Sequence, residues 1–396
     1  MNKKEVKKAP TLRFKGFTND WEQHSLENLY NKIGNAFVGK ATPFFTNHGH
    51  FYLESNNIKD GGINLKDQKF INDVFYIKQR DKWLHTNDLV MVQSGDVGQT
   101  SVITQKYNNC AAHALIMFRK PKNEYISNFL NSYFQSDVAI SKIDKLKIGN
   151  TVNHLLASDM KTFKVTLPKH NSEAQKIIHI FNHLNRLQVL QQRKLKLLKV
   201  MKKALSQYMF CQEIEFVPIL RFNSFSDKWK YERLKNLIVK EIKGKAKADM
   251  KGTKSTYIDT ALLNGGSITK VDSPTDTFHN DIIILWDGSQ AGKIYHGFTG
   301  ALGSTLKSYK PKYSGGFLYQ YLKSKEPIIF LRYRTPNIPH VVKDFTEIFK
   351  INVPSVKEQE KISKTLNYLD QSILVETKKI GSIKKIKKFL LQNMFI

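Results

Sequence analysis

The chain has 396 residues, 41% of them hydrophobic, so it can form two or three folded domains. Its net charge of +29 indicates a polyanionic partner. The alternative is a lysine-rich composition that serves no such partner. No apolar run is long enough to cross a membrane. Only Cys110 and Cys211 are present, which excludes a disulfide scaffold and predicts a cytoplasmic protein. Residues 1–10 are basic without a following apolar segment, and predict a disordered tail rather than a signal peptide.

A block near the start of the chain occurs again in its second half. LRFKGFTNDWEQHSLENL begins at Leu12, and LRFNSFSDKWKYERLKNL begins 208 positions later at Leu220. Further matched segments follow in the same order, and their separations fall through 205, 193 and 186 to 185 positions. Two collinear copies with deletions in the second produce such a series. The sequence therefore predicts an internal duplication.

Each copy is predicted to contain a buried strand that leads into a polar loop. Residues 87–92 and 280–285 become apolar after an Asn-Asp turn, which is typical of a buried strand. The loops that follow read QSGDVGQTS and DGSQAGKI. Earlier in each copy, residues 61–62 and 265–266 are predicted to form a Gly-Gly turn between two strands.

Residues 173–210 and 358–395 are predicted to form two long helices. Apolar residues recur three and four positions apart, which is the pattern of a helix packed against another helix. The second helix has Glu376 within its apolar stripe and Gly381 in its interior, so we expect its packing to fray near Gly381. Helices derived from one ancestral unit are expected to pair as an antiparallel coiled coil.

The predicted fold is α+β, with two α/β domains related by the repeat and separated by the two long helices. The expected domains cover residues 11–170 and 213–355, and the expected helical regions cover 171–212 and 356–396.

The sequence contains no convincing catalytic or metal-binding constellation. His48 and His50 have no accompanying Cys/His cluster, so a surface loop is preferred over a metal site. Asp227 with residues 241–243 resembles part of a nuclease motif, but no buried strand is predicted beneath it. Residues 288–293 are one position short of a phosphate-binding loop. We therefore expect a protein without catalytic activity, with a nuclease of unrecognised active site and a protein scaffold as the alternatives.

Polar loops at equivalent places in both copies carry the candidate DNA-binding residues. KLKIGNTVNH and FLRYRTPNIPH mix cations with Asn, and such side chains read base edges in the major groove. His154 and His340 belong to the repeated frame, so a structural role is as well founded for them as a base contact. The expected base-reading residues are Ser94, Gln99, Lys147, Asn150 and Asn153 in the first copy, and Ser289, Gln290, Lys293, Arg332, Arg334 and Asn337 in the second.

The first long helix is rich in cations. Seven Lys and Arg residues and no acid lie between positions 186 and 203, and such a series repels itself unless phosphates or solvent lie nearby. Arg186, Arg193 and Lys196 are the expected phosphate contacts.

Three repeated features resemble the specificity subunit of type I restriction–modification systems, and the Gram-positive members most of all. They are the LRF-x-x-F-x-x-x-W block, a hydrophobic-Pro pair followed by EAQKI or EQEKI, and a helix that ends in Met-Phe, and they extend over residues 11–396. The resemblance implies two target recognition domains, each reading one half of a split site in double-stranded DNA, with helices that set the spacing.

The same resemblance implies the partners. Two modification subunits, which are adenine methyltransferases that use S-adenosylmethionine, are expected to dock on the helices. Restriction subunits that use ATP and Mg are expected to join them. No cofactor and no catalysis are implied for this chain, and no membrane is implied as a partner.

Overall fold

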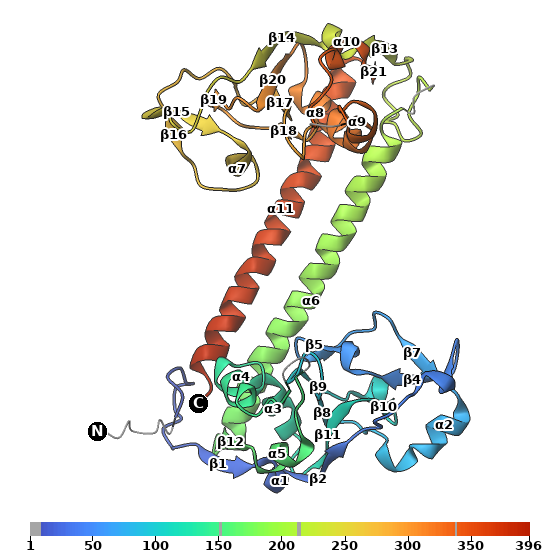
Figure 1. Cartoon of the computed structure of the whole chain (residues 1–396), viewed down its shortest axis with the longest axis vertical. Coiled ribbons are helices and arrows are strands. Elements are labelled where there is room, and N and C mark those ends of the chain that lie inside the picture. Colours follow the sequence, from blue (N-terminus) through green and yellow to red (C-terminus); the bar gives the residue numbers. More distant parts are fainter. Residues whose placement is uncertain (1–8, 150–152, 212–214, 337–338) are drawn as a thin grey trace. The chain divides into compact units, whose positions relative to one another are not determined.

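The computed structural model describes residues 9–149, 153–211, 215–336 and 339–396. It contains two compact units, and each combines one domain with segments of both long helices (Figure 1). Unit 1 comprises residues 1–191 and 379–396, and unit 2 comprises residues 192–378. Of the disordered tail predicted over residues 1–10, only the last two residues are described, and Pro10 is buried.

Unit 1 is built on two four-stranded sheets. The central sheet is antiparallel with strand order β2-β11-β8-β9, the second sheet has the order β10-β4-β7-β3, and β1-β12 and β5-β6 form separate pairs. The strands are β1 Glu22–Ser25, β2 Tyr30–Asn35, β3 Phe45–Thr46, β4 His50–Leu53, β5 Ile58–Lys59, β6 Gly62–Ile63, β7 Lys69–Ile71, β8 Leu89–Val92, β9 Thr100–Val102, β10 Ala111–Ala112, β11 Leu115–Pro121 and β12 Lys164–Leu167. The short helices are α1 Leu26–Leu29, α2 Asp73–Lys78, α3 Ile126–Tyr133, α4 Asp137–Asp144 and α5 Ala157–Thr162.

Unit 2 repeats this plan with a smaller second sheet. Its central sheet has the order β14-β20-β17-β18, its second sheet has the order β16-β15-β19, and β13 pairs with β21. The strands are β13 Lys230–Arg233, β14 Ile238–Lys243, β15 Lys251–Ile258, β16 Lys270–Val271, β17 Ile282–Leu285, β18 Ile294–His296, β19 Ala301–Leu302, β20 Leu306–Pro311 and β21 Lys350–Val353. The short helices are α7 Thr260–Leu263, α8 Gly315–Ser324, α9 Glu326–Arg332 and α10 Phe345–Ile348.

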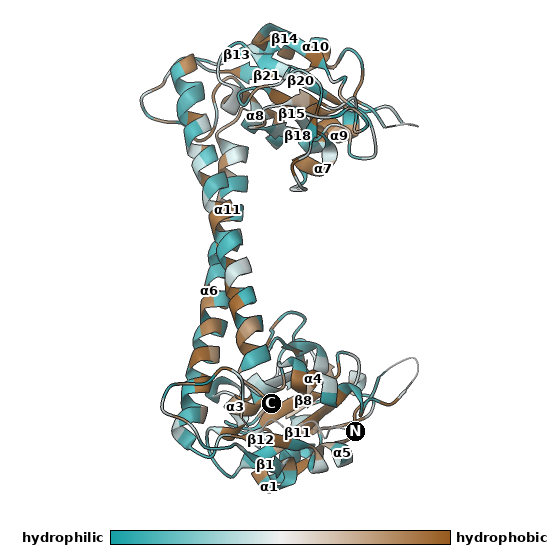
Figure 2. Ribbon diagram, turned by 90° about the vertical axis from the view of Figure 1, so that its left-hand side faces the viewer, coloured by the Kyte–Doolittle hydropathy of each residue, from teal (hydrophilic) through white to brown (hydrophobic). Residues whose placement is uncertain are grey.

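The apolar segment after each Asn-Asp turn is an interior strand of the central sheet. Every residue of β8 and β17 is buried, which confirms the two strands predicted from their apolar runs. In Figure 2, β8 and β11 of unit 1 stand out as hydrophobic ribbons. Strands of this kind lie between two packed layers, so both faces of the strand must be apolar.

The glycines of the second copy lie between two strands, β15 and β16, which pair antiparallel as predicted, but a short helix that the sequence did not predict precedes them. The Asp259 side chain accepts a hydrogen bond from the Leu262 N–H at 2.8 Å and so begins the short helix α7. Gly265, with a φ of 90°, comes directly after the residue that ends this helix. These glycines therefore end a helix, whereas in the first copy residues 61–62 lie at a hairpin between β5 and β6.

The two long helices are α6, Asn171–Tyr208, and α11, Val356–Asn393. They run antiparallel within unit 2, because Lys194 contacts Glu376 and Lys202 contacts Asp370 further along α6. Helix α11 continues without a break through Gly381, and a Cβ atom there would meet nothing within 4 Å, so loose packing near Gly381 stays a prediction. A helical glycine costs about 1 kcal/mol, and burial of the adjacent Ile380 offsets such a cost.

Each long helix ends in the core of a unit, which accounts for the repeated Met-Phe pair. Phe395 packs against Phe129 in unit 1 with ring centroids 5.6 Å apart, and Phe210 packs against Phe317 in unit 2 at 5.9 Å. The same two core rings are contacted edge-on by the repeated tryptophans, Trp21 and Trp229, at 5.9 and 6.2 Å. The LRF-Trp block and the helix end are thus packing partners in both copies.

The arginine of each LRF block forms an ion pair with a buried carboxylate in the first turn of a long helix. Arg13 donates Nε and Nη2 to the two Glu173 carboxylate oxygens at 2.6 and 2.8 Å. Arg221 makes the same two contacts with Glu358, both at 2.8 Å. Both carboxylates are 1% exposed or less. Each pair therefore fastens the start of a domain to a helix.

We expect Glu173→Gln to destabilise unit 1 by about 1.5–3 kcal/mol, because it weakens the two charge-assisted hydrogen bonds that the buried Glu173 carboxylate accepts from the half-buried Arg13 guanidinium. Urea unfolding followed by tryptophan fluorescence measures this change. The matched control is Glu22→Gln, which removes an exposed ion pair with Lys169 and is expected to cost less than about 1 kcal/mol. Equal unfolding midpoints for the two variants would show that the Arg13–Glu173 ion pair does not stabilise unit 1.

Candidate nucleic-acid interface

In both units, the loop after the buried strand lies against the second loop predicted to read DNA. In unit 1, the Leu155 N–H donates a hydrogen bond to the Gln93 carbonyl oxygen at 3.0 Å. In unit 2, the Val341 N–H donates to the Trp286 carbonyl oxygen, also at 3.0 Å. These positions are equivalent in the repeat, so the duplication has kept two adjoining polar loops in each domain.

One glycine in each of these loops allows the loop to pass close to the helix behind it. Gly98 and Gly292 have φ values of 92° and 94°, which L-amino acids with side chains rarely adopt. A Cβ atom at Gly98 would lie 3.3 Å from Ile143 Cγ2, and one at Gly292 would lie 2.9 Å from Ile329 Cγ2. The role of these glycines is loop placement.

The first domain brings several of its predicted residues to one cleft. Ser94, Gln99, Lys147 and Asn153 are described, and Asn150 lies outside the described residues. Gln99, Lys147 and Asn153 line a cleft of about 820 Å³. The Asp60 N–H donates to Gln99 Oε1 at 3.1 Å, and Lys147 Nζ lies 2.6 Å from Asp144 Oδ1. A base edge would have to replace these internal partners.

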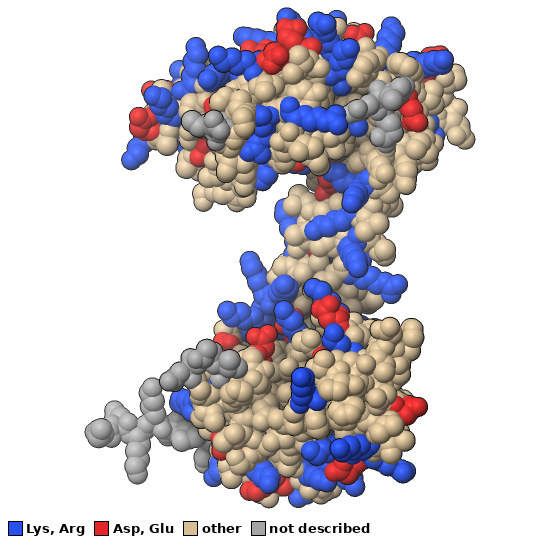
Figure 3. All heavy atoms as spheres, turned by 45° about the vertical axis from the view of Figure 1, so that its right-hand side comes forward, with Lys and Arg blue, Asp and Glu red and all other residues tan. Residues whose placement is uncertain are grey.

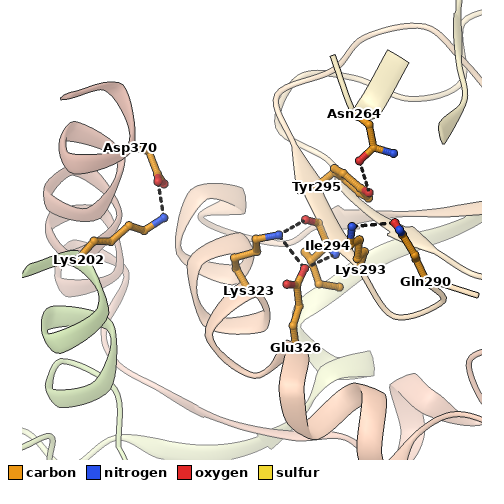
Figure 4. A network of polar contacts seen from close by, with 9 residues as sticks. All are labelled: Lys202, Asn264, Gln290, Lys293, Ile294, Tyr295, Lys323, Glu326 and Asp370. Carbon is orange, nitrogen blue, oxygen red and sulfur yellow. Dashed lines mark hydrogen bonds and ion pairs between the residues drawn. The ribbon is translucent and has the colours of Figure 1, made fainter. Parts of the chain in front are cut away.

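The second domain holds its predicted residues on two adjoining loops. Ser289, Gln290, Lys293, Arg332 and Arg334 are described, and Asn337 lies outside the described residues. Lys293 Nζ donates to Gln290 Oε1 at 2.7 Å (Figure 4). Arg334 Nη2 donates to the Ser289 carbonyl oxygen at 3.1 Å and thereby links the loops. Arg332 is exposed at the end of α9.

His154 and His340 take part in the loop geometry through their backbone. His154 forms an isolated β-bridge with Ser94, and its N–H donates to the Ile148 carbonyl oxygen at 2.8 Å. His340 forms the equivalent bridge with Asp287. These backbone contacts hold the two loops of each unit together, and the role of the two imidazole side chains stays as the sequence predicts it.

Some of the cations on α6 form ion pairs with acids of α11, and others do not. Arg186, Arg193 and Lys196, the predicted phosphate contacts, are exposed on α6. Two other members of the series of seven are paired with acids of α11, since Lys194 contacts Glu376 at 2.7 Å and Lys202 contacts Asp370. The idea that all seven charges need outside partners is therefore wrong for these two. In Figure 3, Lys and Arg still predominate among the charged side chains visible on the helices.

The nuclease alternative gains no geometric support. Glu241 lies on strand β14 and forms an ion pair with Lys307. Within the described ranges, no three His, Cys, Asp or Glu side chains are grouped in a way that suits a metal ion. A search of the same residues finds no helix with the length and apolarity that a membrane span requires.

The sequence is matched by the family model described as type I restriction modification DNA specificity domain, over residues 18–199 and again over residues 226–385. The two matches together span most of the chain, one in each copy of the repeat. The chain belongs to the type I specificity subunit family. Subunits of this family recognise DNA and are not catalytic, which agrees with the absence of a catalytic constellation from the sequence.

One curated relative of this specificity subunit is the type I restriction enzyme MjaVIII specificity subunit of Methanocaldococcus jannaschii. It is 34% identical over 178 residues, which cover 42% of this chain and 42% of the relative. The matched region thus spans less than half of the relative's length.

Solved structures share the fold of this specificity subunit. The crystal structure of a type I restriction-modification S subunit from M. genitalium has a TM-score of 0.72 and 16% identity, and the match covers 98% of this chain and 99% of the other. A chain from a structure on complex assembly and conformational transition of the type I R-M system has a TM-score of 0.50 and 14% identity, with 94% and 96% covered. These matches support two repeated domains with long helices as the fold.

Sequence reasoning singled out the lysines of α6 but missed their counterparts on α11. Lys199, Lys202 and Lys203 of α6 recur as Lys384, Lys387 and Lys388 of α11, each 185 positions later. Both groups line clefts beside a recognition domain. The signal was present in the helix repeat, but only the tertiary structure places these lysines beside the domains.

Proposed function

We propose that this chain recognises a bipartite site in double-stranded DNA for a type I restriction–modification complex. Each domain reads one half of the site with the two adjoining loops of its unit. The observation that supports this most directly is that the duplication preserves the same loop pair, joined by equivalent backbone hydrogen bonds, while the side chains on the loops differ.

The base-reading residues of the proposal are those predicted from the sequence. In the first domain they are Ser94, Gln99, Lys147, Asn150 and Asn153, and in the second they are Ser289, Gln290, Lys293, Arg332, Arg334 and Asn337. Arg and Lys suit guanine, and Asn and Gln suit adenine. The exposed cations Arg186, Arg193 and Lys196 contact phosphates.

The helices set the spacing between half-sites and dock two adenine methyltransferase subunits, which restriction subunits join. Exposed apolar side chains on the helices suit this docking, among them Val189, Leu197 and Val200 of α6 and Tyr368 and Phe389 of α11. S-adenosylmethionine, ATP and Mg serve the partner subunits. Because the substrate is the chromosome, the proposed location is the cytoplasm.

Deletion of the gene tests this function. We expect one bipartite motif to lose its N6-methyladenine across the genome, and a plasmid copy of the gene to restore it. Single-molecule sequencing of native DNA measures the modification. An unchanged methylation map, in a strain where the partner methyltransferase is expressed, would contradict the proposed function.

A further inference from the structure

A cleft of about 630 Å³ lies in unit 2, where the end of α6 meets α8 and α9. Lys199, Lys202 and Lys203 of α6 line one side of it, and Lys323 and Lys325 line the other. Among the described lining residues, Glu326 is the one acid. The cleft therefore combines five cations from two separate parts of the fold.

Acids neutralise only part of this charge. Lys202 pairs with Asp370, and Lys323 Nζ contacts Glu326 Oε1 at 2.8 Å (Figure 4). Lys199 and Lys203 are exposed, and neither forms an ion pair with a residue that the structure describes. Like charges held together in this way repel one another, so an anion bound between them is stabilised.

The cleft adjoins the recognition loop of the same unit. Glu326 Oε1 accepts a hydrogen bond from the Ile294 N–H at 2.7 Å, and Lys323 Nζ donates to the Ile294 carbonyl oxygen at 3.3 Å (Figure 4). Ile294 directly follows Lys293, one of the proposed base-reading residues. Phosphates flank every base edge, so a cationic cleft next to a base-reading loop lies where a DNA backbone passes.

The equivalent cleft of unit 1 has a different charge balance. It contains Lys384, Lys387 and Lys388 at the repeated helix positions, together with Lys147. Four aspartates also line it: Asp60, Asp96, Asp137 and Asp144. Equal numbers of cations and anions leave no net attraction for a phosphate. The helix lysines are therefore present in both units, while only the unit 2 cleft has an excess of positive charge.

We propose that Lys199 and Lys203, which line the unit 2 cleft, bind a DNA backbone phosphate beside the second half-site, and that the unit 1 cleft does not bind one. The two half-sites then contribute unequally to the salt-dependent part of the affinity. This inference rests on the proposed DNA-reading function. Lysine suits such a contact because its ammonium is a compact charge that meets phosphate without a fixed orientation.

Two matched double variants test the inference. Lys199→Gln/Lys203→Gln removes cations from the unit 2 cleft, and Lys384→Gln/Lys388→Gln removes the equivalent cations from unit 1. Binding of the full chain, with its methyltransferase partner, to a 30-base-pair duplex is measured as a function of salt. Each phosphate contact contributes about 0.9 to the slope of log K against log salt. We expect Lys199→Gln/Lys203→Gln to reduce this slope by about 0.9–1.8, and Lys384→Gln/Lys388→Gln to reduce it by less than about 0.9. Equal reductions would overturn the inference.

Two further measurements separate the other occupants of the cleft. The cleft could instead receive an acidic segment of the methyltransferase. In that case Lys199→Gln/Lys203→Gln will release the methyltransferase, as measured by light scattering, and the slope of log K against log salt for DNA binding by the chain without its partner will not change. This result would overturn the inference. A duplex with single neutral methylphosphonates then locates the contact. One such linkage beside the second half-site is expected to weaken wild-type binding and leave the unit 2 variant unaffected, and no such position would contradict the inference. Absence of DNA binding by the wild-type complex would remove the proposed function as well.

Discussion

DNA binding by this chain and its partners is expected to weaken about 10³- to 10⁵-fold between about 50 and 200 mM salt. The chain has a net charge of +29 and exposed cations on α6, so neutralisation of about 6–10 phosphates is expected on binding. Each neutralised phosphate releases condensed counter-ions, and added salt reverses that gain. Fluorescence anisotropy with a labelled duplex, repeated across a salt series, measures the effect.

The salt series needs a control for folding. Thermal unfolding in the same buffers shows whether lost affinity reflects lost structure, and an unlabelled random duplex shows how much binding is independent of sequence. A nearly flat response in a folded complex would mean that base contacts and not phosphates supply the affinity, and it would contradict the charge argument.

Replacement of residues 220–354 by the equivalent block of a relative is expected to change one half of the methylated motif and leave the other half unaltered. The block contains the whole second recognition domain, from before β13 to the end of β21. Specific binding exceeds non-specific binding by about 10³- to 10⁷-fold, so the original motif should lose essentially all modification. Methylation mapping of cells that carry the hybrid measures the result.

The structure adds one requirement for the donor block. Arg221 lies inside the block and its partner Glu358 lies outside, so the donor block must carry an arginine at that position. A hybrid with this arginine replaced by Met is the matched control, and it should fail through instability. If a folded, soluble hybrid with the arginine lost both half-sites, the domains would not read DNA independently.

The fold was largely predictable because its main signals are local. Helical and strand periods depend on neighbouring residues, so β8, β17 and the two long helices follow from their apolar patterns. The short helix α7, which precedes the glycines of the second copy, was not predicted. The Asp259 side chain caps this helix by accepting a hydrogen bond from the Leu262 N–H.

The candidate site was predictable only as a set of loops. Repetition indicated which polar loops belong together, since the matched positions around His154 and His340 recur in both copies. It did not indicate that Gln99 and Lys147 already have partners within unit 1, because those partners are Asp60 and Asp144. A polar side chain in a loop looks the same in the sequence whether its partner is internal or external.

The sequence by itself determined the duplication, the interior strands, the long helices and the excess of positive charge. Only the tertiary structure decided where that charge remains available. Lys194 and Glu376 are 182 positions apart, and Lys202 and Asp370 are 168 apart, yet each pair is in contact. The spacing of apolar residues predicts which face of a helix is buried. An ion pair between two helices depends on how residues far apart in the chain pack together, and no local pattern contains that information.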